Sequence, residues 1–166
     1  MVRAVHERVE PEMVNAGVPE ADRHGATVGT EDRTGITEDM IATLVAAFYA
    51  RVRADSVLAP IFEAKVRDWD FHLAKLCDFW SSVVLGSGRY HGQPMLAHIT
   101  LAIGTEHFDR WVRLFEDTVV GLCPPAAAAR FIDKARRIAD SFELGMGVAR
   151  GEIRTPTRSR RAGDGG

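Results

Sequence analysis

The segment from residue 69 to residue 85 has large apolar side chains at the spacing of one helix face, and this pattern constrains the fold more than any other. The face contains Trp69, Leu76 and Trp80, and it also contains one imidazole, that of His72. Side chains three or four positions apart lie on the same side of a helix, so the segment predicts a helix with one buried face. An imidazole among large apolar side chains needs a hydrogen-bond partner or a ligand.

The remaining apolar pattern is helical as well. No segment alternates apolar and polar residues for long enough to predict a strand, so we expect an all-α fold without internal repeats. Capping residues, prolines and glycines give the expected bounds. We expect a first helix capped by Thr37 and ended by a turn around Pro60, a second from about residue 65 to Gly86, a short third begun by Pro94, a fourth spanning Phe108 to Leu122, and a fifth after Pro125 that stops at Gly145.

The length and composition predict one globular domain with two extensions. A chain of 166 residues with 46% hydrophobic residues is long enough for one substantial core. Residues 1–35 and 147–166 are rich in charge, proline or glycine and cannot bury enough surface to offset the entropy of ordering. We therefore expect a domain at residues 36–146 between disordered N- and C-terminal extensions, the second of them basic.

Charge and cysteine content exclude several classes of function. A net charge of −2 gives no argument for nucleic-acid binding, and no apolar run approaches the roughly 20 residues that cross a bilayer. The N-terminus lacks the apolar segment of a secretory signal. Cys77 and Cys123 stand in apolar surroundings, as buried thiols do in a reducing compartment. The sequence therefore predicts a cytoplasmic protein without membrane insertion.

Two histidines are candidates for chemistry. His98 comes soon after Pro94, which can begin a short helix, and the intervening loop can bring this imidazole opposite His72. Two imidazoles facing each other across an aromatic gap suit a flat apolar ligand with a coordinated centre. Taken alone, either imidazole is more often a hydrogen-bonded structural histidine than a ligand, so the prediction rests on the residues around the pair. His91 and His107 fall at a loop and near a helix start, where exposed histidines are common, although His107 could also line the pocket.

The sequence gives no support for other metal sites or for common hydrolase chemistry. It has no Cys-x-x-Cys or His-Glu-x-x-His pair for zinc, and no Glu-x-x-His pairs for a di-iron bundle. A phosphate-binding Gly-x-x-x-x-Gly-Lys loop and a Gly-x-Ser-x-Gly elbow are also absent. One histidine ligand in an apolar cavity suits haem, whose macrocycle supplies the other four nitrogens.

Several short motifs follow one another in a distinctive order. They are Phe48-Tyr49 with Val52-Arg53, Pro60-Ile61-Phe62, His72 with Phe79-Trp80, Tyr90-x-Gly92-Gln93-Pro94-x-x-x-His98, and His107-Phe108-x-x-Trp111-x-x-Leu114-Phe115. Together they resemble the third group of truncated haemoglobins over about residues 36–146. The glycine-pair motifs of the first two groups are absent from this region, in agreement with the third.

This resemblance implies a two-over-two helical globin sandwich that holds haem b, iron protoporphyrin IX. It implies that His98 is the proximal iron ligand. It also implies a set of distal and haem-contacting residues, namely Tyr49, His72 and Trp111 around the bound ligand, Phe62 packed on the haem, and Phe48 and Leu76 lining the distal cavity.

The chemistry of these side chains agrees with that arrangement. Dioxygen at a haem iron carries partial negative charge, and hydroxyl, indole and imidazole groups can each donate a hydrogen bond to it. The haem propionates need cations or hydroxyls at the mouth of the pocket. Lys75 and the pair Arg89-Tyr90 are candidates for that role, and solvated surface positions are the alternative for them.

Three functional interpretations remain open at this point. The first, which we favour, is a haem protein that binds dioxygen and other diatomic ligands such as carbon monoxide, as a monomer or weak dimer. The second is a haem enzyme that converts nitric oxide to nitrate or turns over peroxide, supplied by an external reductase. The third is a haem-free helical regulatory module in which the histidines are packed polar residues.

Overall fold

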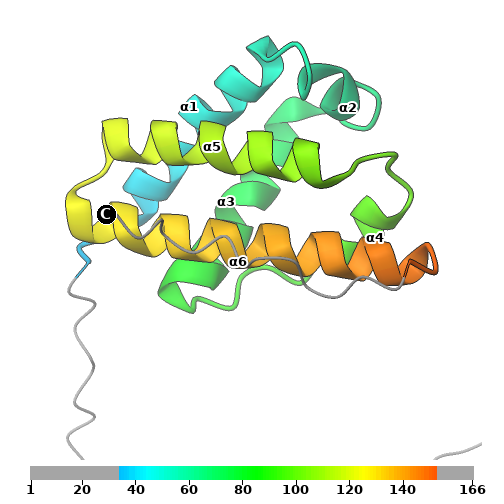
Figure 1. Cartoon of the computed structure of the whole chain (residues 1–166). Helices are drawn as coiled ribbons and strands as arrows, with labels where there is room; N and C mark the ends of the chain where they lie inside the picture. Colours follow the sequence, from blue (N-terminus) through cyan, green and yellow to red (C-terminus); the bar gives the residue numbers. More distant parts are fainter. Residues whose placement is uncertain (1–33, 153–166) are drawn as a thin grey trace, which may run out of the picture. The chain divides into compact units, whose positions relative to one another are not determined.

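The computed structural model describes residues 34–152, and within that range all regular structure is helical. The helices are α1 (Glu38–Ala54), α2 (Ala59–Glu63), α3 (Trp69–Leu85), α4 (Pro94–Ile99), α5 (Thr105–Leu122) and α6 (Pro125–Ala149) (Figure 1). The all-α prediction is confirmed for this part of the chain. Residues 1–33 and 153–166 of the predicted extensions lie outside the described residues, whereas residues 147–149, assigned to the C-terminal extension, continue α6. None of the helices just named is long and apolar enough to cross a bilayer.

Two helix pairs form two layers. Helix α1 packs against α3, and α5 packs against α6. The α5–α6 pair lies across the first pair, with α1 touching α5 and α3 touching α6 (Figure 1). A connection of only Cys123 and Pro124 makes α5 and α6 antiparallel neighbours. The fold is therefore the predicted two-over-two sandwich.

Local signals set the ends of α1 and α3. The Thr37 side chain accepts a hydrogen bond from the Met40 amide at 3.1 Å, as an N-cap does. The Asp68 side chain accepts one from the Phe71 amide at 2.9 Å, so α3 begins at Trp69 and not near residue 65 as predicted. Gly86 ends α3 with a φ of 69°, a conformation that glycine adopts without strain.

The predicted stop of the last helix at Gly145 is wrong, since α6 continues to Ala149. A Cβ atom at Gly145 would lie 2.6 Å from the terminal carbon of Met95 on α4. The missing side chain therefore lets α4 approach α6, and the next residue, Met146, is fully buried. This packing outweighs the cost of glycine inside a helix, which is about 1 kcal/mol.

An aromatic column connects the two layers. The rings of Trp80, Phe115 and Trp111 stack in succession, with centroids 4.8 and 5.4 Å apart and planes within 11° of parallel. Phe115 is fully buried between the two indoles. Since α3 supplies one indole and α5 the other, this column fixes how the layers lie on each other. It also forms the floor of the cavity described next, because both indoles line that cavity.

Candidate functional site

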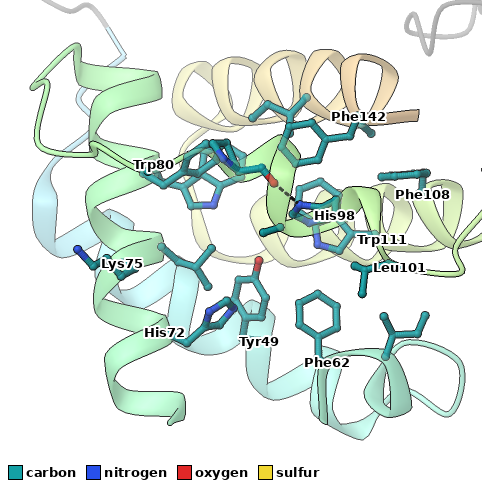
Figure 2. A pocket seen from close by; sticks show the side chains of 18 of the residues that line it. Tyr49, Phe62, His72, Lys75, Trp80, His98, Leu101, Phe108, Trp111 and Phe142 are labelled. Atoms are coloured by element: carbon teal, nitrogen blue, oxygen red, sulfur yellow. Dashed lines mark hydrogen bonds between the residues drawn. The ribbon is translucent and has the colours of Figure 1, made fainter. Parts of the chain in front are cut away.

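A cavity of about 490 Å³ opens between the layers, within the size range of small-molecule sites (Figure 2). Its walls come from α1, α3, α4, α5 and α6 and from the short helix α2. The structure brings nine of the ten predicted site residues to this one cavity. They are Tyr49, Phe62, His72, Lys75, Leu76, Arg89, Tyr90, His98 and Trp111.

Phe48 is the predicted site residue that does not line the cavity. It is fully buried behind the lining, with its ring edge-on to Tyr49 at 4.8 Å and to Trp111 at 5.4 Å. Phe48 and Tyr49 are adjacent in α1, so their side chains point about 100° apart around the helix and only one of them faces the cavity. Phe48 therefore supports two cavity residues from behind.

His98 is held in one tautomer. Its Nδ1 lies 2.6 Å from the carbonyl oxygen of Pro94, one turn earlier in α4, and an N–H at Nδ1 donates to that oxygen (Figure 2). The other ring nitrogen, Nε2, is then left with a free lone pair. Burial lowers the pKa of His98. Because the imidazole is therefore neutral at physiological pH, Nε2 is available as a metal ligand.

Tyr49 and Trp111 form a donor pair on another wall. The Tyr49 side chain is only 4% exposed, and burial raises its pKa, with the Trp111 indole N–H donating to the hydroxyl in partial opposition. Figure 2 shows the hydroxyl directed into the space that Trp111 and His98 face. The phenol therefore stays protonated at any physiological pH and can donate its own hydrogen to a ligand.

His72 lies beside Tyr49 on the cavity wall. Its ring lies edge-on to Tyr49 at 6.0 Å and to Trp69 at 5.7 Å between centroids. Its Nε2 is buried and has no hydrogen-bond partner among residues 34–152. Burial lowers the pKa of His72, and the imidazole of His98 lowers it further. A buried polar atom without a partner is costly, so this nitrogen is suited to a ligand that enters the cavity.

Two predicted cations, Arg89 and Lys75, line the cavity, and of these only Arg89 forms ion pairs with carboxylates of the described residues. Arg89 pairs with Glu38 and lies 3.8 Å from an oxygen of Asp78. The ammonium of Lys75 lies 5.5 Å from the centroid of the Phe71 ring, and no carboxylate in the described part of the chain is within ion-pair distance of it. Of the two predicted cations, Lys75 is therefore the one available to an anionic ligand group.

The sequence prediction missed several cavity residues. His91 lines the cavity and is exposed, as its loop position predicts, and it was given no role there. His107 is half-buried and lines the cavity, in agreement with the expectation that it could do so. Nδ1 of His107 lies 3.1 Å from the Gly104 amide nitrogen and 3.0 Å from a carboxylate oxygen of Glu106. Phe142 also contributes, with its ring 4.7 Å from that of His98. The helical stripe of α6 signalled that Phe142 is buried, but not that it faces a cavity.

Comparison with known proteins identifies the family. The family model for bacterial-like globins matches residues 32–132. The chain is 34% identical over 113 residues to the group 3 truncated hemoglobin ctb of Campylobacter jejuni, covering 65% of this chain and 89% of that protein. The crystal structure of a group III truncated hemoglobin from the same species matches with a TM-score of 0.64 at 33% identity, over 67% of this chain and 91% of the other. The chain is a group III truncated haemoglobin.

The cavity of this truncated haemoglobin fits the haem that its family implies. No three His, Cys, Asp or Glu side chains in residues 34–152 converge as a metal site of their own. A single neutral imidazole, His98, is what a porphyrin needs, because the macrocycle completes the coordination plane. The apolar walls and the unpartnered nitrogen of His72 are consistent with a flat ligand in this cavity.

Proposed function

We propose that this globin holds haem b through His98 and binds dioxygen and other diatomic ligands next to Tyr49, His72 and Trp111. The observation that carries the proposal is the hydrogen bond from His98 Nδ1 to the Pro94 carbonyl at 2.6 Å. It leaves a fixed, neutral Nε2 in a cavity that is also lined by Tyr49, His72 and Trp111. The haem supplies an iron with an open position for a small gas molecule, and the protein supplies everything around it.

The distal donors give the cavity its selectivity. Tyr49 donates through its hydroxyl and His72 through its otherwise unpartnered nitrogen, while the Trp111 indole N–H donates to the Tyr49 oxygen and so holds that hydroxyl in place. Each such hydrogen bond to a partly negative oxygen is worth about 1.5 to 3 kcal/mol in a site without competing water. Dioxygen gains more from these donors than carbon monoxide, which carries less charge. We therefore expect slow dioxygen release.

The remaining cavity residues hold the macrocycle. Phe62 and Leu76 supply apolar contact area, which keeps water from the centre of the cavity. Lys75 and the Tyr90 hydroxyl are suited to the propionates at the mouth. Arg89 is less suited, since its guanidinium is already paired with two carboxylates.

A second candidate function is conversion of nitric oxide to nitrate. The specific observation in its favour is that Tyr49, supported by Trp111, and His72 lie on one cavity, because a ligand held for long is suited to reaction rather than to delivery. One nitric oxide and one dioxygen need one electron to form nitrate, so an external reductase must act on the protein. Peroxide turnover needs the same retention of an oxygen ligand. Stopped-flow mixing of the oxygenated protein with nitric oxide separates the nitric oxide reaction from reversible binding.

Absorption spectra of the haem-loaded chain test the proposal. The reduced protein should show a histidine-ligated haem and a shifted Soret band with carbon monoxide. His98→Gly should lose that spectrum and regain it when free imidazole enters the vacated space. His91→Gly is the matched control, since it also removes a cavity-lining imidazole. An unchanged spectrum in His98→Gly without imidazole would assign the iron to another ligand.

A further inference from the structure

One wall of the cavity is a segment without regular secondary structure. Residues 86–93 connect α3 to α4, and four of them, from Arg89 to Gly92, line the cavity. An irregular segment of eight residues depends on side-chain contacts for a fixed shape. In this structure the contacts converge on Glu38, which lies in the first turn of α1 and is not a cavity residue.

The first contact runs through a buried hydroxyl. Ser81 of α3 is fully buried, and its Oγ lies 2.7 Å from Oε1 of Glu38 and 2.7 Å from Oγ of Ser87. A hydroxyl has one hydrogen, so Ser81 donates to the carboxylate and accepts from Ser87. The carboxylate thereby orients the hydroxyl that holds the start of the 86–93 segment.

The second contact is an ion pair with the middle of the segment. The guanidinium of Arg89 binds the other oxygen of Glu38. Arg89 has a second, longer contact of 3.8 Å to Asp78 on α3. One oxygen of Glu38 therefore accepts from Ser81, which holds Ser87, and the other binds Arg89. Through these contacts Glu38 links Ser87 and Arg89 of the segment to α1.

The next residue, Tyr90, lines the cavity, so its position depends on where Arg89 is held. The amide of Tyr90 donates to Oγ of Ser82 at 2.9 Å, and its ring lies edge-on to Phe79 at 5.3 Å. A Cβ at Gly92 would overlap the Tyr90 hydroxyl, so the segment folds back closely over this ring. Movement of Arg89 would displace Tyr90 directly.

We propose that Glu38 is a positioning residue for the cavity wall. It acts through Ser81, Ser87 and Arg89 and keeps Tyr90 in place at the mouth. The role of the wall in holding haem rests on the proposed function. The positioning itself concerns contacts within the protein and is testable without haem.

Hydrogen exchange of the full-length, haem-free chain tests the positioning. The Tyr90 amide is the reporter, since it is protected by Ser82. Glu38→Gln keeps an acceptor for Ser81 but loses the partly exposed ion pair, and should raise Tyr90 exchange about two- to fivefold. Glu38→Ala also strands the buried Ser81 hydroxyl and should raise it roughly tenfold or more.

Asp39→Asn is the matched control, because it removes the same charge from the same helix turn. It should leave Tyr90 exchange unchanged. Equal increases in Glu38→Gln and Asp39→Asn would show an effect on the helix end only and would overturn the proposal. Wild-type exchange of the Tyr90 amide in Glu38→Ala would overturn it as well.

The haem-loaded protein provides the second test. Glu38→Gln should speed transfer of haem to an excess of an apoprotein acceptor about two- to fivefold. In a double-mutant cycle, Glu38→Gln should have no further effect once Arg89→Gln is present. Additive effects would refute action through Arg89. A chain that takes up no haem would refute the proposed function while leaving the exchange experiment interpretable.

Discussion

Replacing Tyr49 by phenylalanine removes one hydroxyl from the cavity and leaves the rest of the side chain in place. The Tyr49 ring is buried and packs edge-on against Phe48 and Phe62, with centroids 4.8 and 5.7 Å away. Phenylalanine keeps both contacts, so the fold should persist. The variant therefore removes the hydrogen bond that the hydroxyl donates together with the acceptor of the Trp111 indole N–H, and leaves the packing in place.

The magnitude follows from what the hydroxyl does in the structure. Its hydrogen bond to a partly charged oxygen is worth about 1.5 to 3 kcal/mol, which is roughly ten- to a hundredfold in a dissociation rate. The Trp111 indole N–H, which donates to the Tyr49 oxygen, is released by the substitution and can turn to the ligand. Since this recovers part of the loss, we expect dioxygen dissociation to accelerate by about tenfold.

Stopped-flow displacement of dioxygen by carbon monoxide measures the rate. Carbon monoxide dissociation in the same variant is the internal control, and it should change much less. Burial raises the pKa of Tyr49, so the wild-type rate should not respond to its ionisation between pH 6 and 9. An unchanged dioxygen rate in Tyr49→Phe, or an equal change for both gases, would refute the role of the hydroxyl.

Two further predictions concern stability and pH. Burial lowers the pKa of His72 and His98 below the 6.5 of a free imidazole, so the haem-free chain should lose stability below pH 6.5, where the unfolded chain takes up protons that the folded chain does not. In urea unfolding, His98→Gln should lose less stability between pH 7 and 5 than the wild type. An identical dependence of stability on pH in the two proteins would contradict this. Arg110 holds the pKa of Asp55 at about 2 by binding both carboxylate oxygens at 2.8 Å. Asp55 should therefore stabilise the fold above pH 3.8 and lose that effect as the pH falls toward 2. The unfolding midpoint of Asp55→Asn should fall less steeply with pH in this range than that of the wild type. An equally steep fall in both proteins would argue against this role of Asp55.

The sequence by itself determined the helices and several of their ends. The period of the apolar residues predicts α1, α3, α5 and α6, and local chemistry at Thr37 and Gly86 sets two ends. These signals are readable because cap and period depend on residues within a few positions of each other. The motif pattern also led to the residues that the cavity brings together.

Only the tertiary structure decided which side chains face the cavity and which are already committed elsewhere. Phe48 has an aromatic side chain suited to lining the cavity but lies behind Tyr49. Arg89 has the charge of a propionate partner but is paired with Glu38, which lies 51 positions earlier in the chain. The helix continues through Gly145, because Met95 of another helix occupies the space where a side chain would lie. Each outcome depends on a contact between residues far apart in the chain, and no local preference encodes such a contact.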